Sequence, residues 1–308
     1  MWILLLLFSA FALGGGLYAY RISFFSPKKG RDQRPSTASP QFDPYRPEMK
    51  RLYQQLMARE CEIVTVRSHD GLILSGRYYH VADGAPLDIC FHGYRSSWMT
   101  DFSGGSEISQ QMGHNLLLID QRAHGKSQGK TITFGLLERQ DLLRWVEYAN
   151  TRFGSDTPIF LFGISMGGAT VLMAPQNKLT PNVKGIIADC PYANALEIIL
   201  HVAKKMPIPL WLVKPFVILG AGLYGGFNLL ETDARKELTN GKIPVLILHG
   251  EADTFVPPSM SDLVSCNPQH ITRHTFPGAS HGISCLVDRP RYQKIIMDFV
   301  EDALRTAV

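Results

Sequence analysis

One serine of this chain stands in a sequence context that suits nucleophilic attack. Ser165 is the centre of a Gly-Ile-Ser-Met-Gly run at 163–167. A β-branched and aromatic run at 158–162 precedes it and an apolar run at 169–174 follows it, which predicts a strand, a sharp turn and a helix. Glycine suits such a turn because a Cβ would clash with the closely approaching chain. The turn would lift the hydroxyl off the sheet, and the first N–H groups of the helix would point to it.

A serine is a weak nucleophile without a base and an orienting acid. His281 lies on a small-residue loop after the last predicted strand, and it is the candidate base because such a loop lets the ring reach a serine. Asp253 comes just past a buried strand, at the sheet edge that carries Ser165, where its carboxylate would fix the histidine tautomer. Glu251 is the alternative acid on this loop, and capping of the turn at Pro257 is the alternative role for Asp253.

Acyl transfer also needs two N–H donors for the negative charge that develops on the carbonyl oxygen. Met166 offers one because it follows the serine directly. Tyr94 offers the second, on the His-Gly-Tyr-Arg-Ser-Ser loop at 92–97 that follows a predicted strand at 87–91. The tyrosine ring would either line an acyl pocket or pack as an ordinary aromatic side chain.

Strands that alternate with helices place these residues at one edge of a sheet. A hairpin is predicted at 62–67 and 73–80, since Ser-His-Asp-Gly at 68–71 is a turn signal. Further strands are predicted at 87–91, 115–120, 158–162, 183–189, 243–249 and 269–276, and helices at 48–60, 136–153, 169–174 and 291–303. This alternation predicts an α/β fold with a doubly wound, mostly parallel sheet.

The segment 194–228 interrupts the alternation. It holds helix-like apolar runs, several prolines and several glycines, and it is longer than a crossover helix needs. We interpret it as a small helical lid inserted over the edge of the sheet where ligands of open α/β sheets bind. An ordinary crossover helix with a long loop is the alternative. A second membrane span is disfavoured because lysines at 204, 205 and 214 divide the apolar run.

The N-terminal stretch 1–20 contains no charged residue and is about long enough to cross a bilayer as a helix. We predict a transmembrane anchor at 1–22, a linker rich in proline and basic residues at 23–47, and a single α/β domain at 48–308 that includes the lid insertion. A cleaved signal peptide is the alternative, although no positive residue precedes the apolar run. Basic residues follow the stretch directly, so the positive-inside rule favours a cytoplasmic domain; a secreted or extracytoplasmic domain is the alternative.

Charge and cysteine spacing limit the classes of partner that we expect. The net charge is +4, and no stripe of Lys and Arg interleaved with aromatic residues stands out, which argues against nucleic-acid binding. The five cysteines show no zinc-like spacing, and we expect neither a metal nor a cofactor. Buried free thiols are the expectation for Cys90 and Cys190. A Cys266–Cys285 disulfide remained an option that would count against the cytoplasm.

These motifs together resemble the α/β hydrolase superfamily, in particular its prolyl-oligopeptidase-like and serine-aminopeptidase-like bacterial hydrolases. The resemblance runs from about Glu62 to the C-terminus, and the order of serine, aspartate and histidine agrees with it. It implies a triad of Ser165, Asp253 and His281, with Tyr94 and Met166 as oxyanion donors. The motifs that carry it are Asp70-Gly71-Leu72, His92-Gly93-Tyr94, the segments 120–127, 163–168 and 249–257, and Ser280-His281-Gly282.

We therefore expect a metal-free serine hydrolase that cleaves carboxylic esters through an acyl-enzyme, with a small acyl substrate and membrane attachment through the N-terminal helix. A serine peptidase is the first alternative, although no acidic pair marks a site for a free peptide amino terminus. An acyl thioesterase is the second. From another class, a membrane-tethered binding or scaffold protein with a decayed site is the non-enzymatic alternative. The motifs specify fold and triad more than substrate, because this fold hosts many reactions.

Overall fold

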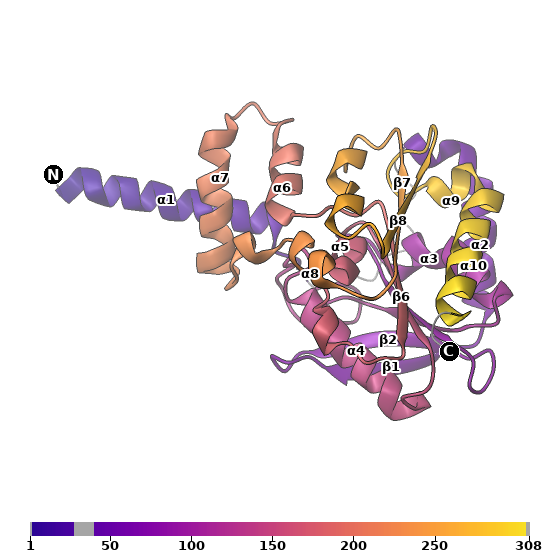
Figure 1. Cartoon of the computed structure of the whole chain (residues 1–308). Helices are drawn as coiled ribbons and strands as arrows, with labels where there is room; N and C mark the ends of the chain where they lie inside the picture. The colour runs from indigo at the N-terminus through magenta and orange to yellow at the C-terminus, as the bar shows by residue number, and fades with distance from the viewer. Residues whose placement is uncertain (1, 28–39, 306–308) are drawn as a thin grey trace.

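A computed structural model of the chain describes residues 2–27 and 40–305. Its centre is an eight-stranded sheet in the order β1-β2-β4-β3-β5-β6-β7-β8 (Figure 1). The strands β1 and β2 form an antiparallel hairpin, β2 pairs antiparallel with β4, and the remaining pairs are parallel. The predicted mostly parallel sheet is therefore confirmed. The strands are β1 (Glu62–Arg67), β2 (Ile73–Tyr79), β3 (Leu87–Phe91), β4 (Asn115–Ile119), β5 (Ile159–Ile164), β6 (Val183–Asp189), β7 (Val245–Gly250) and β8 (Ile271–Phe276).

Helices cover both faces of the sheet. One face carries α4, α5 and α8, and the other carries α2, α3, α9 and α10 (Figure 1). Two further helices, α6 and α7, stand apart from the sheet beside α1. The helices are α1 (Trp2–Ser23), α2 (Arg46–Ala58), α3 (Trp98–Gln111), α4 (Glu138–Phe153), α5 (Met166–Leu172), α6 (Ala195–Ala203), α7 (Leu210–Leu219), α8 (Arg235–Asn240), α9 (Ser284–Val287) and α10 (Arg289–Arg305).

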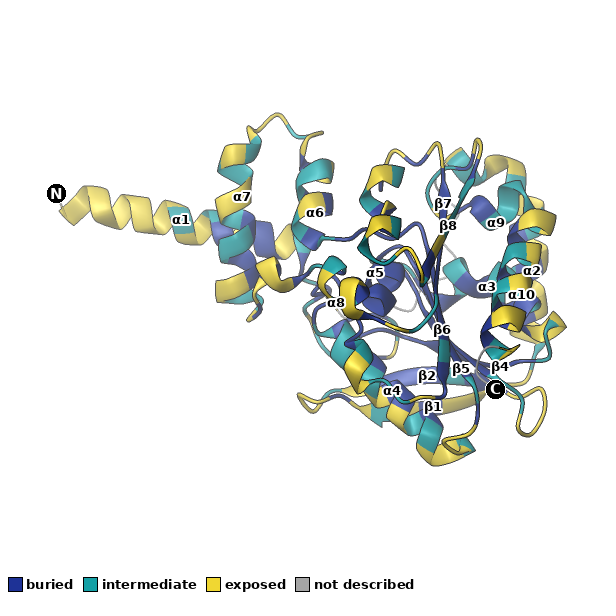
Figure 2. Ribbon diagram, in the orientation of Figure 1, coloured by how far each residue is buried: buried dark blue, intermediate teal, exposed yellow. Residues whose placement is uncertain are grey.

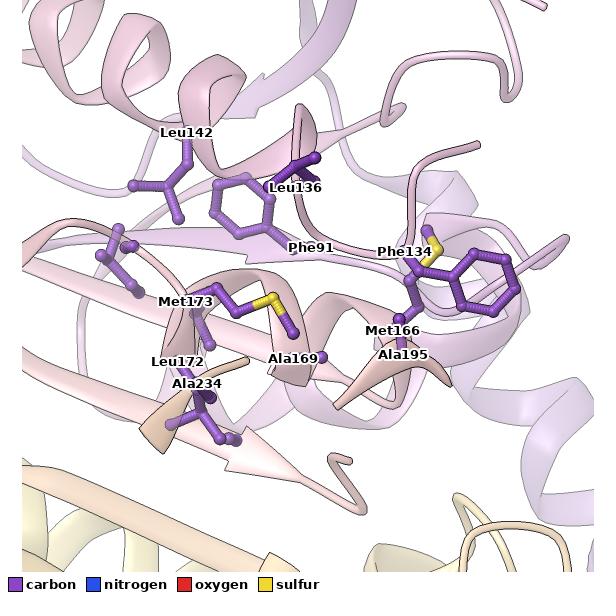
Figure 3. Packing of buried hydrophobic residues seen from close by; sticks show 14 of the residues in the cluster. Phe91, Phe134, Leu136, Leu142, Met166, Ala169, Leu172, Met173, Ala195 and Ala234 are labelled. Carbon is purple, nitrogen blue, oxygen red and sulfur yellow. The ribbon is translucent and has the colours of Figure 1, made fainter. Parts of the chain in front are cut away.

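Each face of the sheet has its own apolar core. Every residue of β3, β4, β5 and β7 is buried, as expected of parallel strands covered on both sides. On one face Met166, Ala169 and Met173 pack with Phe91 and Leu142 (Figure 3). This packing fixes α5, and therefore the turn that precedes it, against the sheet.

The helix α3 was not predicted from the sequence. Its interior holds Gly104 and Gly105 among several serines, residues of low helix propensity. Tertiary packing accounts for the glycine, because α3 lies so close to α9 that a Cβ on Gly104 would be 3.4 Å from the Cys285 sulfur. Ser97 caps the helix by accepting a hydrogen bond from the Thr100 N–H.

The first helix is joined to the domain more tightly than a tether would be. Phe24, directly after α1, is fully buried, and the hydroxyl of Ser26 donates to the Ala123 carbonyl at 2.7 Å. The predicted linker at 23–47 therefore begins and ends in ordered structure, since a 3₁₀ helix forms at Pro40–Tyr45. Its central residues, 28–39, lie outside the described part of the chain.

The segment 194–228 forms α6, α7 and a π-helical turn at Gly220–Tyr224. It is helical, as expected, but its main partner is α1 (Figures 1 and 2). All five cysteines are free thiols, so the optional Cys266–Cys285 disulfide is absent; Cys90 and Cys190 are buried as expected.

The turn after β4 is held by a buried ion cluster. Arg122, which is 3% exposed, donates to both carboxylate oxygens of Asp141, at 2.6 and 2.7 Å. It also donates to Asp70 in the β1–β2 turn, at 3.0 and 3.1 Å. The cluster thus fastens the hairpin, the β4 turn and α4 together.

Replacing Asp141 with Asn should leave the Arg122 charge buried without its main partner. We expect a loss of about 3–5 kcal/mol in the free energy of unfolding, measured by urea denaturation of the detergent-solubilised chain. Asp70→Asn is the matched control, because that side chain is 39% exposed and its loss should be smaller. Equal, sub-kcal/mol losses in both variants would contradict this account of the cluster.

Candidate active site

The turn at Ser165 is strained and closely packed. Ser165 has φ 55° and ψ −114°, an uncommon conformation for a residue with a Cβ. A Cβ on Gly163 would collide with the Gly167 carbonyl, and one on Gly167 would collide with the Phe91 carbonyl of β3. Both glycines are therefore required by contact, as the sequence analysis argued. The Ser165 N–H donates to the Asp189 carbonyl at 2.8 Å, which ties the turn to β6.

His281 lies between the serine and an aspartate. Its Nε2 is 3.0 Å from the Ser165 Oγ, and its Nδ1 is 2.6 Å from the Asp253 Oδ2. With Asp253 ionised, Nδ1 carries the proton and donates it to the carboxylate, and Nε2 accepts from the serine hydroxyl. The structure thus brings the three predicted residues into one hydrogen-bonded chain.

Asp253 is held in its ionised form. Burial opposes its ionisation, but hydrogen bonds from His249 and His281 outweigh burial and lower its pKa to about 2. Its Oδ1 also accepts the N–H groups of Phe255 and Val256, at 2.9 and 2.8 Å. Glu251, the alternative acid, is exposed and accepts a hydrogen bond from the Thr275 hydroxyl instead.

The two predicted oxyanion donors lie at the ends of adjacent strands. Met166 is the first residue of α5, so its N–H lies outside the helical hydrogen-bond ladder, while its side chain is fully buried (Figure 3). On the facing loop, the Gly93 N–H donates to Asp101 at 2.6 Å and the Arg95 N–H to the His124 ring at 2.9 Å. Tyr94 lies between these two anchored residues and lines the cavity beside Ser165.

The Tyr94 side chain joins this loop to the end of α1. Its hydroxyl donates to the Ser23 carbonyl at 2.8 Å, and its ring packs 5.0 Å from Phe134. Arg95 reaches the same place, with its guanidinium donating to the carbonyls of Ile22 and Phe25 at 3.0 and 3.1 Å. The tyrosine therefore both borders the pocket and packs.

A cavity of about 280 Å³ opens at Ser165 and His281. Its apolar lining comes mainly from the N-terminal region and from strand β5, and the predicted lid residues at 194–228 are not among the residues that line it. Gln41, in the 3₁₀ helix, donates to the His281 carbonyl at 3.2 Å and closes one side. The apolar lining residues are Phe42, Met49, Leu52, Phe162, Ile164, Phe255 and Leu286.

Two carboxylates at this cavity, the half-buried Asp101 and the buried Asp189, were not singled out from the sequence. Burial raises the pKa of Asp101, although the Gly93 N–H and the Ser96 hydroxyl donate to it. Burial also raises the pKa of Asp189 to about 6, against a 2.9 Å hydrogen bond from Tyr292. The second carboxylate oxygen of Asp189 has no hydrogen-bond partner. The signal for Asp189 was its place at the end of a buried strand, the rule that found Asp253.

Ligand-capable atoms of Cys190, Asp253 and His281 lie within 4.8 Å of one another, a spacing that a metal ion could use. The histidine and aspartate atoms are engaged with each other and with Ser165. Burial raises the pKa of the Cys190 thiol well above its ordinary value, which disfavours the thiolate that metals bind. The group fits the hydrogen-bonded chain better than a metal site.

Comparisons with known proteins point to an alpha/beta hydrolase fold. A family model described as alpha/beta hydrolase fold matches residues 89–214. The uncharacterised protein YqkD of Bacillus subtilis is 26% identical over 230 residues, which cover 73% of this chain and 74% of that protein. The thiohydrolase aneE of Aspergillus aculeatus is 32% identical over 139 residues, 44% of this chain and 42% of that protein. The Pyrococcus furiosus esterase Pf2001 has a similar structure, with TM-score 0.66 and 24% identity over 80% of this chain and 93% of its own.

Asp189 should make folding depend on pH. Its pKa in the folded chain, about 6, is above the unfolded value of 3.8, so the folded state holds the proton more tightly. The contribution of Asp189 to the free energy of unfolding is complete below the unfolded pKa and is lost as the pH rises through about 6. Asp189→Asn should remove this pH dependence. Between pH 4 and pH 7 the free energy of unfolding of the variant should therefore rise, relative to that of wild type, by on the order of 1–3 kcal/mol. Urea denaturation at both pH values measures it, and a pH-independent difference would contradict it.

Proposed function

We propose that this chain, which belongs to the alpha/beta hydrolase superfamily, is a serine hydrolase that cleaves carboxylic esters of apolar acyl groups. The observation that carries the proposal is the continuous contact from Ser165 through His281 to Asp253 beside an apolar cavity. A nucleophile, its base and an orienting acid in this geometry suit acyl transfer.

In the proposed mechanism the Ser165 oxygen attacks the carbonyl carbon of the ester while His281 Nε2 takes the serine proton. Asp253 stabilises the imidazolium that forms, and the N–H groups of Tyr94 and Met166 hold the oxygen that becomes negative. Collapse of this intermediate expels the alcohol, which takes the proton from His281. Water, deprotonated by His281, then attacks the acyl-enzyme and releases the carboxylic acid and the free serine.

The cavity favours a short-to-medium acyl group. Its wall beside the serine is formed by Phe162 and Ile164, and residues from α2, Met49 and Leu52, extend it. A thioester is the second candidate substrate, because the thiohydrolase aneE is a relative over part of the chain. The same acyl pocket and triad would serve either leaving group.

The N-terminal helix is proposed to remain as a membrane anchor. Among the described residues, α1 is the helix that is long and apolar enough to span a bilayer, and little of it is buried in the domain. A cleaved signal sequence has no role in the packing of the mature domain. Here Phe24 is fully buried, and residues 22, 23 and 25 accept hydrogen bonds from the loop that carries Tyr94. The basic residues after α1 favour a cytoplasmic domain by the positive-inside rule.

Ser165→Ala should abolish covalent labelling of the full chain by a fluorophosphonate probe, because the acceptor oxygen is gone. Ser259→Ala is the matched control, since this exposed serine follows the loop that supplies Asp253 but lies outside the contact chain, and its labelling should equal wild type. Failure of folded wild type to label would overturn the proposal. A panel of p-nitrophenyl esters, acyl thioesters and aminoacyl amides, assayed with and without a chelator, then ranks the leaving groups. Faster turnover of the amides would overturn the ester assignment.

Asp253→Asn should lower kcat for a p-nitrophenyl ester by about 10³–10⁴-fold, because an amide favours the wrong histidine tautomer. Glu251→Gln, on the same loop but outside the contact chain, should keep most activity. Because the pKa of Asp253 is about 2, its ionisation should not shape the pH–rate profile of wild type above about pH 4. Equal losses of kcat in both variants would show that the role of the orienting acid does not belong to Asp253.

A further inference from the structure

The second half of the inserted segment is apolar without being part of a core. The helix α7 and the π-helical turn after it, Leu210–Tyr224, form one apolar helical stretch. Its buried residues are Val217, Gly220 and Ala221. Trp211 is 73% exposed and Leu223 is 55% exposed. An apolar helix of this length is either a core helix or an element that lies at a membrane surface, and its exposure favours the second.

This stretch packs on α1 through small residues. A Cβ on Gly220 would lie 2.7 Å from the Gly16 carbonyl oxygen, so the two backbones approach closely. The Phe216 ring lies 5.3 Å from the ring of Phe11, and the Tyr224 hydroxyl donates to the Leu13 carbonyl at 3.0 Å. Close approach through glycine is typical of helices that associate within a membrane.

The crossing places α7 against the middle and the domain-side half of the predicted span. Figure 1 shows that α1 runs on past α7, and its outer part is exposed in Figure 2. With 22 residues, α1 is about 33 Å long, close to the roughly 30 Å of a bilayer core. The contacts of α7 and the π turn run from Phe11, near the middle of α1, to Tyr20, with the close backbone approach at Gly16. If α1 spans the bilayer, Gly16 lies about 10 Å from the domain-side end of the helix, so α7 lies in the domain-side half, close to the depth of about 5–10 Å that an in-plane apolar helix reaches.

The charges around this stretch suit an anionic lipid surface. Lys204 and Lys205, at the end of α6, and Lys214, on α7, are exposed. Their ammonium groups can reach lipid headgroups while the alkyl stems stay in apolar surroundings. Lysines near an anionic leaflet add to the attraction of an apolar helix face.

The insertion also contacts the loop that supplies Asp253. The His201 ring of α6 lies 3.2 Å from the Thr254 carbonyl, in the loop that supplies Asp253. The next residue, Phe255, is 41% exposed, borders the cavity and packs 5.0 Å from the His281 ring. An exposed aromatic side chain therefore borders the cavity beside the insertion.

We propose that α6 and α7 form an in-plane membrane element that docks on an anionic bilayer surface and holds the cavity next to the lipid. Together with α1 they form one unit, with one helix across the bilayer and the other two along its surface. This deepens the proposed function, because an ester drawn from the membrane itself becomes the favoured substrate class. Docking takes α1 as an uncleaved anchor and does not depend on Ser165 being the nucleophile.

The test is tryptophan fluorescence of the full chain in vesicles of phosphatidylcholine and phosphatidylglycerol. Trp98 and Trp145 are buried, so a Trp2→Phe background leaves Trp211 as the exposed indole. Lipids brominated near the headgroup should quench it, and aqueous iodide should not. Trp2→Phe with Trp211→Phe is the matched control, which should lose the quenchable emission. Flotation confirms reconstitution, and mass spectrometry should find α1 retained.

Other outcomes would overturn the proposal. Iodide quenching of Trp211 without bromolipid quenching, in floated protein, would place α7 in water. Protection from iodide that depends on protein concentration in detergent would place a second copy on α7. A mature chain without α1 would remove the packing partner on which the proposal depends. Fluorophosphonate labelling of the same samples reports on Ser165 separately, so docking and catalysis can fail independently.

The lysine contribution has its own matched pair. Lys204→Glu with Lys205→Glu should lower bromolipid quenching of Trp211 about twofold or more on anionic vesicles, because attraction becomes repulsion. Lys178→Glu with Lys242→Glu makes the same charge change at exposed lysines before β6 and β7. These lysines lie at the N-terminal ends of the strands, whereas α6 follows the C-terminal end of β6, so quenching should be unchanged. Equal effects of the two pairs would overturn the role of the lysines.

Discussion

The contact between the Ser165 turn and strand β3 is the constraint on which the rest of the site depends. Gly167 lies against the Phe91 carbonyl so closely that no side chain fits. The contact exists because β3 and β5 are parallel neighbours, with Phe91 opposite Gly163. The loops that leave the two strands consequently face each other. One supplies Met166 and the other Tyr94, so a single packing contact sets the geometry of both candidate oxyanion donors.

Three carboxylates lie at or beside the cavity, and each is stabilised differently. Asp253 has two histidine donors and two backbone donors, which keep it ionised. Asp101 holds the turn at Gly93 through the backbone N–H and through Ser96. Asp189 has only the Tyr292 hydroxyl and favours its neutral form. The donors thus concentrate negative charge at the one carboxylate that touches His281, where it can stabilise an imidazolium.

Sequence patterns located the strands and the three hydrogen-bonded residues because both depend on local signals. Buried strands are continuous apolar runs, and Ser165 and Asp253 each follow one, whereas His281 follows the mostly polar strand β8. The remainder depended on contacts between distant segments. The helix α3 forms despite its glycines, with Cys285 packed closely against Gly104, and the cavity wall at Phe42 comes from the predicted linker 23–47. The segment 194–228 carries a helix signal, but nothing in its own sequence specifies α1 as its partner.

The end of α1 is part of the domain rather than an attachment to it. Phe24 fills a place in the core, and the carbonyls of Ile22, Ser23 and Phe25 accept the side-chain protons of the loop that contains Tyr94. A fragment that starts after residue 27 would leave an unfilled cavity where Phe24 packs and would free that loop. Solubilising this protein by truncation would consequently remove the support of the Tyr94 loop together with the apolar helix.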